Sequence, residues 1–390
     1  MTSLSHQQQI EKGFQAWNLP FYFSKPVLRH LLHFVDGMSS VGYGGKLTEI
    51  HAFSHQATHR TTLGHFLQHS PWEESFLLQQ SKKQVLKKIG KEGPLFFIFD
   101  DTIAKKTKPS SQATSPIEAG SFHYSHTEGK SVWGHQVLQL MLANEQTAYP
   151  YDFRLYQKEQ GKSKIDLTVD LLQEVSDFIQ PTYLLCDSWY TSQKVIETAL
   201  QQGMHTIGAL KTNRIIYPKD MRIQVKDFAA YIQKADTDLV TIGQEKYRVY
   251  RYEGALNNLS NGVVLLCWSA DDKELDPKRM RSFLSTDVKL TTEQILTYYS
   301  YRWRIETYFQ QVKGHLGFQG YQVRSQRAIE RFWLLIQFTY LFLSDLYGKS
   351  FTETIHLVRR DKFTSIIEFV HTAATKGASL EQVKNDLQVA

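Results

Sequence analysis

The stretch Leu95-Phe-Phe-Ile-Phe-Asp-Asp-Thr102 is a run of five apolar residues that ends in two aspartates. Its length, its aromatic content and the preceding Gly93-Pro94 are typical of a strand buried on both faces. The pattern recurs at Tyr183-Leu-Leu-Cys186, which is followed by Asp187. Because helical spacing separates the two runs, the chain is predicted to have an α/β fold with these strands in one sheet.

The segments around these runs alternate between strand and helix patterns as far as Leu210. Further strands are expected at Ser121–Tyr124, His135–Leu142, Pro150–Leu155 and His205–Leu210, and helices at Asp166–Phe178 and Ser192–Gln202. The alternation then stops, and antiparallel strands are predicted at Leu239–Ile242, Tyr247–Tyr252 and Val263–Trp268. One helix is predicted from Thr292 to Lys313, opened by a capping sequence at Thr291 and closed by Gly314.

The two ends of the chain have the periodicity of helices. Near the N-terminus the periodic segments are Pro26–Val35, Leu47–Phe53, Thr61–Leu67 and Trp72–Leu78. We therefore expect a helical N-terminal domain (1–90), the first part of an α/β domain (91–210), a β-rich insertion (211–286), the second part of the α/β domain (287–345) and a helical C-terminal tail (346–390). The N-terminal domain is either a DNA-binding domain or a helical cap.

Composition excludes several classes of protein. The chain is 42% hydrophobic and 22% charged with a mean hydropathy of −0.38, as in soluble globular proteins. Phe332–Tyr347 is too short and too polar to span a bilayer and is predicted to be a buried helix, and the N-terminus lacks a secretory pattern. Cys186 and Cys267 lie in apolar runs without a CxxC partner, which excludes cysteine zinc sites and favours a reducing cytoplasm.

The positive charge is concentrated at two places in the chain. The net charge is +6 and the pI is about 9.0. Residues 277–331 hold ten Lys/Arg against four Asp/Glu, and residues 1–90 hold nine against five together with eight histidines. This distribution suits a nucleic-acid partner, although a basic enzyme without one would have the same net charge.

Two aspartates, Asp187 and either Asp100 or Asp101, follow buried strands. Carboxyl ends of parallel strands meet at one edge of a sheet, where ligands bind in open α/β folds. Carboxylates brought together there repel one another unless a cation lies between them, and oxygen ligands suit Mg²⁺ or Mn²⁺. The alternative is that these aspartates only form turns at strand ends.

The predicted helix over Thr292–Lys313 has a polar stripe beside its apolar face. Tyr299, Arg302, Glu306 and Lys313 fall within an arc of roughly 60° at about 100° per residue. From spacing alone, these residues form either a functional stripe or a solvated face with local ion pairs between Glu306 and its two cations.

The four residues reproduce the Y-x2-R-x3-E-x6-K signature of a group of bacterial insertion-sequence transposases in the DDE superfamily, which this chain resembles. Asp101-Thr102 after the first strand, Asp187-Ser-Trp-Tyr190 after the second and the β-rich insertion agree with this resemblance, which covers roughly residues 95–340. It implies a ribonuclease-H-like catalytic core, a mixed sheet flanked by helices, that the insertion interrupts.

The resemblance also implies a site and an activity. The catalytic and metal-binding triad would be Asp101, Asp187 and Glu306, with Asp100 a less favoured first member because threonine commonly follows the family's aspartate. Two Mg²⁺ ions, replaceable by Mn²⁺, would activate the attacking oxygen and stabilise the departing one. Tyr299, Arg302 and Lys313 would bind phosphates beside the scissile bond.

The resemblance implies two partners. One is double-stranded DNA, both the terminal inverted repeats of the element and the target DNA, and the other is a second copy of the chain in a homodimeric synaptic complex. No membrane is involved, and the location would be the bacterial cytoplasm, at the nucleoid when the protein is bound to DNA. Hairpin intermediates in some members need an aromatic residue that holds a flipped base. The tryptophans Trp189, Trp268 and Trp303 are candidates for that role, with core packing as the alternative for each.

Several basic residues outside the helix are candidate DNA contacts. His123, His126 and Lys130 follow the first strand and would either line the DNA channel or belong to a surface loop. Lys211 and Arg214, at the start of the insertion, would touch DNA.

Two other functions remain open at this stage. One is a domesticated or inactive relative that binds DNA without cutting it, against which the intact triad argues. The other is a metal-dependent phosphohydrolase acting on small phosphoesters, which would leave the helix signature unexplained.

Overall fold

The computed structural model describes residues 7–54, 58–175, 178–257 and 259–387, and these residues form two compact units. The first unit consists of Met1–Lys88, Ile103–His135 and Tyr308–Ala390, and the second consists of Ile89–Thr102 and Gln136–Thr307. Strands β1 and β3 and helix α10 each pass from one unit into the other.

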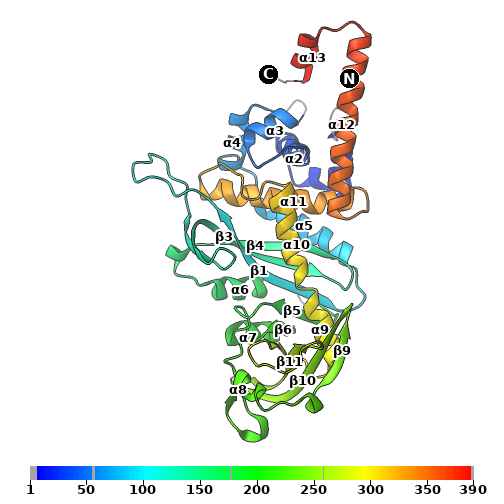
Figure 1. The fold of residues 1–390 in the computed structure, drawn as a ribbon. Helices are drawn as coiled ribbons and strands as arrows, with labels where there is room; N and C mark the ends of the chain where they lie inside the picture. Colours follow the sequence, from blue (N-terminus) through cyan, green and yellow to red (C-terminus); the bar gives the residue numbers. More distant parts are fainter. Residues whose placement is uncertain (1–6, 55–57, 176–177, 258, 388–390) are drawn as a thin grey trace. The chain divides into compact units, whose positions relative to one another are not determined.

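The second unit is built on a mixed sheet whose central strands include β1 (Figure 1). Its strands are β1 (Leu95–Lys105), β3 (Lys130–Ala143), β4 (Ala148–Tyr156), β5 (Thr182–Cys186) and β6 (His205–Ala209). They follow the order β4-β3-β1-β5-β6, with β5 parallel to both β1 and β6 and with β4 antiparallel to β3. Helices α6 (Lys164–Gln173) and α7 (Gln193–Gln201) precede and follow β5, so the predicted alternation of strands and helices is confirmed.

The register between β1 and β5 determines which side chains share a face of the sheet. The last paired residues are Phe99 and Cys186, so Asp100 and Asp187 are the next residues on two neighbouring parallel strands. Strand residues alternate between faces. Phe96 packs against Tyr298 on one face of β1, whereas Phe99 packs against Tyr190 on the other. Asp100 therefore shares a face with Phe96, and Asp101 shares the opposite face with Phe99.

Strand β1 is longer than the sequence predicts. The expectation that the aspartates end this strand is wrong, because β1 continues through both of them to Lys105. Strand β3 is 14 residues long and extends the pairing, as shown by the hydrogen bond from the Lys106 N–H to the Trp133 carbonyl (2.9 Å). By contrast, β5 ends at Cys186, directly before Asp187, as predicted.

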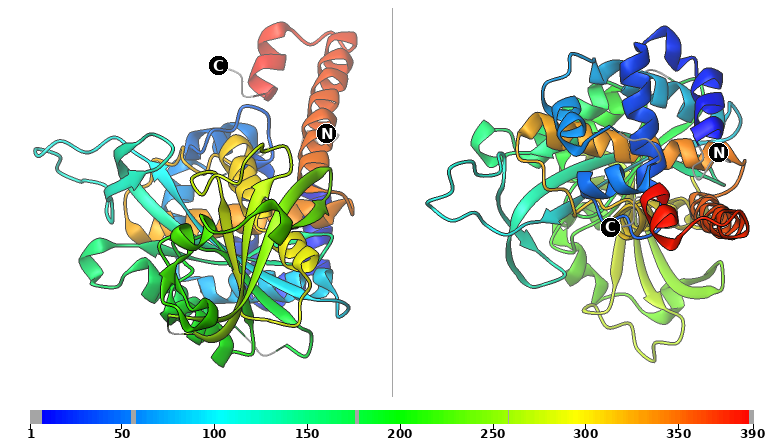
Figure 2. Two further views of the ribbon diagram at one scale, coloured as in Figure 1. Left: turned by 60° about the horizontal axis from the view of Figure 1, so that its bottom comes forward. Right: turned by 90° about the horizontal axis from the view of Figure 1, so that it is seen from above.

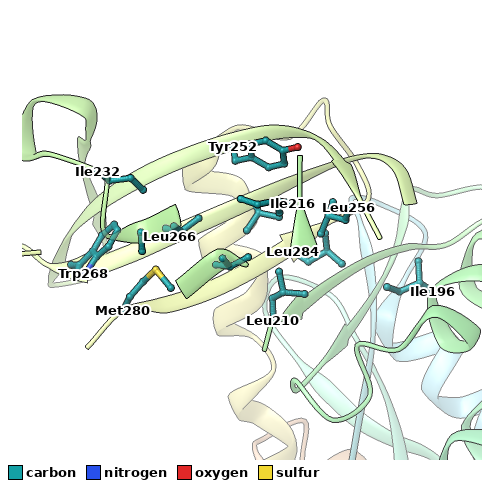
Figure 3. Close-up of a cluster of buried hydrophobic side chains, with 13 residues drawn as sticks. Ile196, Leu210, Ile216, Ile232, Tyr252, Leu256, Leu266, Trp268, Met280 and Leu284 are labelled. Carbon is teal, nitrogen blue, oxygen red and sulfur yellow. The ribbon is translucent and has the colours of Figure 1, made fainter. Parts of the chain in front are cut away.

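The segment after β6 is rich in strands. It contains β7 (Ile215–Ile216), β8 (Ile223–Gln224), β9 (Asp238–Ile242), β10 (Glu245–Leu256), β11 (Leu259–Ser269) and β12 (Arg281–Ser285), with the short helix α8 (Val225–Ala229) between β8 and β9. Strand β12 pairs antiparallel with β6, which joins these strands to the sheet. Thirteen buried residues, Ile196 of α7 and twelve from this segment such as Trp268 and Tyr252, form a core cluster (Figure 3).

The predicted single helix over Thr292–Lys313 is two helices, α9 (Thr292–Ser300) and α10 (Trp303–His315). Between them the backbone tightens, and Arg302 and Ile305 donate to carbonyls three residues earlier, those of Tyr299 and Arg302. Such bonds are typical of a 3₁₀ turn, which shifts the angular positions of the side chains from those of a continuous α-helix. Arg302 lies in this turn, directly before α10.

The first unit is mostly helical. Its elements are α1 (Gln7–Ala16), α2 (Lys25–Met38), α3 (Leu47–Phe53), α4 (Arg60–Gln68), α5 (Glu74–Ile89), α11 (Gln326–Leu346), α12 (Phe351–Thr375) and α13 (Leu380–Leu387), together with β2 (Ser121–Ser125), which pairs with the first part of β3. The predicted helices near both ends of the chain are thus confirmed. Helix α11 packs against α1, α2, α4 and α12 (Figure 2).

Helix α11 is the buried helix that the sequence predicts at Phe332–Tyr347. Its side chains are buried on all sides over most of its length. In the part of the chain that the structure describes, no helix is long and apolar enough to cross a membrane.

Arg331 joins α11 to the N-terminal helices. This side chain is fully buried, and its guanidinium donates to the carbonyls of Phe66 (2.9 Å), Leu67 (3.2 Å) and Trp72 (2.8 Å). It also pairs with Glu74 and lies over the Trp72 ring, 4.4 Å from the centroid. Removing it would leave buried carbonyls without a donor.

Arg331→Met is expected to lower the free energy of unfolding by about 3 kcal/mol, because it leaves three buried carbonyls without their donor and removes one of the two cations of Glu74. The matched control is Arg327→Met, since Arg327 also bonds to Glu74 (3.1 Å) but is half exposed. The control is expected to change stability by less than about 1 kcal/mol. Chemical denaturation followed by circular dichroism measures both, and equal losses would contradict the assignment.

Candidate functional site

Asp100 and Asp187 directly follow the last β1–β5 pair, and they are close enough for the Asp187 charge to raise the pKa of Asp100. Asp100 is mostly buried, with 20% of its side chain exposed. Burial, and after it the charges of Asp187 and Asp101, raise the pKa of Asp100 to about 7, although Arg302 acts in the opposite direction. A carboxyl in this position is costly to ionise unless a cation is close.

Arg302 connects Asp100 to Glu306. Its guanidinium donates to Asp100 Oδ2 (3.2 Å) and to Glu306, four residues later on α10. It also lies 5.8 Å from the centre of the Tyr299 ring. Although burial lowers the pKa of Arg302, its interactions with Tyr299, Glu306 and Asp100 raise it overall, so the guanidinium stays protonated. Tyr299, Arg302 and Glu306 are therefore brought together as the sequence predicts.

Lys313, the fourth residue of the predicted stripe, belongs to the part of α10 in the first unit. There its ammonium lies 6.0 Å from the centre of the Phe309 ring. Burial lowers the pKa of Lys313.

Asp101 has a different environment from Asp100. Its carboxylate accepts hydrogen bonds from Lys164 Nζ (2.8 Å), from the Gln136 side-chain amide and from the Tyr190 hydroxyl. All three partners come from the second unit, and none of them is one of the predicted site residues. The structure thus places Asp100, not Asp101, on the face that carries Arg302.

The loop after β5 is ordered by Asp187 itself. Asp187 Oδ1 accepts from the backbone N–H groups of Trp189 (2.9 Å) and Tyr190 (3.2 Å). These two bonds fix one oxygen of the carboxylate directly after the strand.

The remaining tryptophans and cations of the second unit differ in exposure. Trp189 is 49% exposed, and the ammonium groups of Lys164 and Lys211 each lie 5.0 Å from a ring centroid of its indole. Arg214 donates to the Thr191 carbonyl (2.8 Å), so at least one of its amino groups holds the loop after β5. Trp303 is 60% exposed.

The remaining candidates from the sequence, Trp268, His123, His126 and Lys130, lie in the insertion or in the first unit. Trp268 is buried in the insertion, and its indole N–H donates to the Asp276 carbonyl (3.0 Å), which supports the packing interpretation. His123, on β2 in the first unit, is also buried and bonds to Ser121 (2.9 Å), so it does not line an open surface. His126 is exposed beside Tyr124, and Lys130 lies 3.9 Å from Glu128.

Two neighbouring cavities lie next to Arg302 in the second unit. One of about 500 Å³ is lined by Ser188, Arg281, Tyr299, Arg302 and Trp303, among others. The other, of about 710 Å³, shares Arg281 and Tyr299 with the first and extends over β10 and β11. Together the two cavities form a depression with cationic and aromatic walls, and Ser188, the residue after Asp187, lines the smaller one.

The carboxylates fit a divalent cation in chemistry but are not gathered around one point. Asp100, Asp187 and Glu306 offer only oxygen ligands, and the raised pKa of Asp100 shows that a positive charge is favourable there. Among the described residues, however, no three Asp, Glu, His or Cys side chains converge closely enough to hold a metal. Arg302 supplies the positive charge between Asp100 and Glu306, and joint ligation by all three carboxylates requires its side chain to move.

Three polar residues around Asp101 were not predicted, and two of them, Gln136 and Tyr190, are buried. Gln136 is one of two polar residues in the mostly apolar stretch 136–143, and Tyr190 lies in the Asp187-Ser-Trp-Tyr190 sequence. Lys164 begins α6 directly after the capping Ser163. Only the first two carry a signal in the sequence, since a lysine at the start of a helix is ordinarily solvated.

The model of the transposase DDE domain family matches residues 91–342, which is well over half of the chain. The chain belongs to this family. The match includes both aspartate-bearing strands, the insertion, the helices α9 and α10 and most of α11, so the transposase domain spans all the residues of the candidate site.

A further comparison, with solved structures, finds a cryo-EM structure of piggyBac transposase in a synaptic complex with hairpin DNA. The match has a TM-score of 0.45 and 11% sequence identity, and it covers 80% of this chain. The DDE-domain chain spans 59% of the length of that transposase. No curated protein matches significantly.

Asp100→Asn is expected to stabilise the metal-free DDE domain at high pH. An unfolded Asp ionises near pH 3.8, whereas folded Asp100 keeps its proton until about pH 7, so wild-type stability falls as the pH rises between these values. Because the asparagine cannot ionise, the substitution removes this loss. After the lost Arg302 bond is subtracted, the variant should exceed wild type in free energy of unfolding by about 2 kcal/mol at pH 8 and differ little from it near pH 4.

Thermal unfolding from pH 4 to 8, with a chelator present, measures the effect. Asp170→Asn is the control, because Asp170 forms a surface ion pair with Lys162 (2.6 Å). A pH-independent difference between Asp100→Asn and wild type would contradict the raised pKa.

Proposed function

We propose that this protein is a DNA transposase of an insertion sequence, in the group with the Y-x2-R-x3-E-x6-K signature. It would cut DNA at the ends of its element and join the freed 3′ ends to target DNA. The observation that carries the proposal is the arrangement of Asp100 beside Asp187 with Arg302 connecting Asp100 to Glu306. Membership of the DDE domain family supports the same reaction class.

The strand order supports a ribonuclease-H-like core. Such a core has a mixed sheet with an antiparallel part, followed by parallel strands that each connect through a helix. The order β4-β3-β1-β5-β6 has this form, and the strands β7 to β12 and helix α9 come before the helix that carries Glu306.

The first member of the triad is Asp100 in this proposal, in place of the Asp101 expected from the sequence. Asp100 faces Asp187 and Arg302, whereas Asp101 faces Lys164, Gln136 and Tyr190. A metal ligand must be able to point an oxygen at the ion, and Asp101 has three donors on its carboxylate already.

Asp100, Asp187 and Glu306 would hold divalent ions, with Mg²⁺ as the natural metal and Mn²⁺ as a substitute. When bound, two ions would supply a nucleophilic oxygen and neutralise charge on the departing oxygen. Asp100 would then bind in its ionised form, since a neighbouring cation lowers the pKa that burial raises.

Arg302 and Tyr299 would contact phosphates beside the scissile bond, and Lys313 would do so further along α10. Arg302 would exchange Asp100 or Glu306 for a phosphate oxygen, for which a guanidinium is well suited. The depression that begins beside Ser188 and extends past Arg281 would hold DNA backbone. The partners are the element's terminal inverted repeats, the target DNA and a second copy of the chain in the synaptic complex.

Substituting each proposed ligand is expected to abolish cleavage of a duplex that carries the inverted repeat flanking the gene. Asp100→Asn, Asp187→Asn and Glu306→Gln should each reduce the rate by at least about 10³-fold at every Mg²⁺ or Mn²⁺ concentration, because each removes a ligand of the reacting centre. Asp101→Asn should cut DNA at saturating metal. Gel analysis of end-labelled DNA measures the rates.

The assignment of the first aspartate is tested by the same gels. If Asp101→Asn were inactive at all metal concentrations while Asp100→Asn remained active, Asp101 would be the ligand. If all four variants cut as wild type does, or if wild type bound DNA without cutting it, the protein would not be the proposed enzyme.

Arg281→Gln is expected to weaken DNA binding and to reduce the slope of log K against log salt concentration by about 0.9, the value for one phosphate contact. Arg281 is exposed on β12 and lines both cavities. The control is Arg222→Gln, since Arg222 is also exposed but lines neither cavity. Fluorescence anisotropy at several salt concentrations distinguishes them, and equal slopes would remove Arg281 from the interface.

A further inference from the structure

We propose that Asp101 and Tyr190 are positioning residues that hold Asp100 and Asp187 together and so set the affinity of the site for divalent metal. This inference rests on the proposed function, because it concerns the same two carboxylates. It assigns a role to the second aspartate of the Asp-Asp pair and to a tyrosine that the chemistry itself does not use.

Three hydrogen bonds link the four residues in a chain that runs from Asp100 through Asp101 and Tyr190 to Asp187. The Asp101 N–H donates to Asp100 Oδ1 (2.8 Å), and the Tyr190 N–H donates to Asp187 Oδ1 (3.2 Å). The side chains of the two donors bond to each other, since the Tyr190 hydroxyl donates to Asp101 Oδ2. Each positioning residue thus orients one metal-binding carboxylate with its backbone and contacts the other positioning residue with its side chain.

This set of bonds links two separate chain segments. Asp100 and Asp101 lie on β1, and Asp187 and Tyr190 lie at the end of β5 and in the loop after it. The β1–β5 pairing ends at Phe99 and Cys186, so backbone pairing does not hold the segments beyond that point. The Tyr190–Asp101 bond provides a connection where the two carboxylates repel each other.

Asp101 and Tyr190 are themselves held by other side chains, and the charge of Asp101 is balanced by a lysine. Lys164 supplies a cation 2.8 Å from Asp101 Oδ2, and Gln136 donates to Asp101 Oδ1. Tyr190 is 1% exposed, and its ring packs edge-on against Phe99, with the ring centres 4.9 Å apart. A buried hydroxyl with a fixed ring can hold its acceptor in one position, which is what metal affinity requires of the residues behind a ligand.

The test compares Tyr190→Phe with Tyr183→Phe. Tyr183 is a matched control because it lies on β5, is buried and also donates its hydroxyl to a carboxylate, Asp287 Oδ2 (3.0 Å). Both substitutions delete one hydroxyl-to-carboxylate bond, but only one deletes the bond to Asp101. Their thermal stabilities should fall by similar amounts.

Mn²⁺ binding to the full chain is measured by titration calorimetry, and the Mg²⁺ dependence of DNA cleavage is measured in parallel. Tyr190→Phe should raise the Mn²⁺ dissociation constant about 10- to 100-fold and raise the half-saturating Mg²⁺ concentration equally, with the rate at saturating metal close to that of wild type. Tyr183→Phe should change neither. Asp101→Asn, which keeps an acceptor for Tyr190, should weaken binding less than Asp101→Ala.

An unchanged Mn²⁺ affinity in Tyr190→Phe, or an equal change in Tyr183→Phe, would overturn the inference while leaving the proposed function in place. If wild type neither bound Mn²⁺ nor cut DNA, both would fall. If Tyr190→Phe did not fold, the two Asp101 variants would decide. A higher Mn²⁺ affinity in Asp101→Asn than in Asp101→Ala would support the inference, and a wild-type affinity in both would overturn it.

Discussion

The parallel pairing of β1 with β5 is the constraint on which the candidate site depends. Because Phe99 is the last partner of Cys186, the next residue on each strand is an aspartate, and the two side chains lie on the same face. Burial and mutual repulsion make this pair unfavourable in the absence of a cation, as the raised pKa of Asp100 shows. The carboxylate pair therefore lowers the stability of the fold locally and, in return, gives this position a strong preference for positive charge.

Arg302 supplies that charge from the tightened turn between α9 and α10. A continuous helix would fix Arg302 at one angle relative to Glu306, whereas the 3₁₀ turn places it at a junction with fewer α-helical bonds. The guanidinium can therefore pair with a carboxylate from β1 as well as with its own helix. If a metal ion replaced Arg302 beside the carboxylates and Arg302 bound a phosphate in turn, charge would be redistributed without any movement of the strands.

The sequence predicts most elements of the fold because apolar periodicity and capping residues are local signals. It also predicts Asp187, since β5 is short and ends there, and the proximity of Arg302 to Glu306, since the two are four residues apart. The choice between Asp100 and Asp101 could not be predicted, because Leu95–Phe99 is buried on both faces and shows no alternation that would mark its register. The partners of Asp101 come from β3, α6 and the loop after β5, which only the assembled sheet brings together.

Because two aspartates follow each other in β1, loss of one residue before them should be tolerated better than gain of one. Deletion of one residue within Leu95–Phe99 would turn each following side chain to the other face, so that Asp101 would occupy the place of Asp100. A carboxylate would still face Asp187, and Thr102 would face Lys164 in place of Asp101. Insertion of one residue would instead place Phe99 opposite Asp187 and remove the carboxylate from that face. Length variation in β1 among functional relatives of this chain should therefore include shortening by one residue more readily than lengthening.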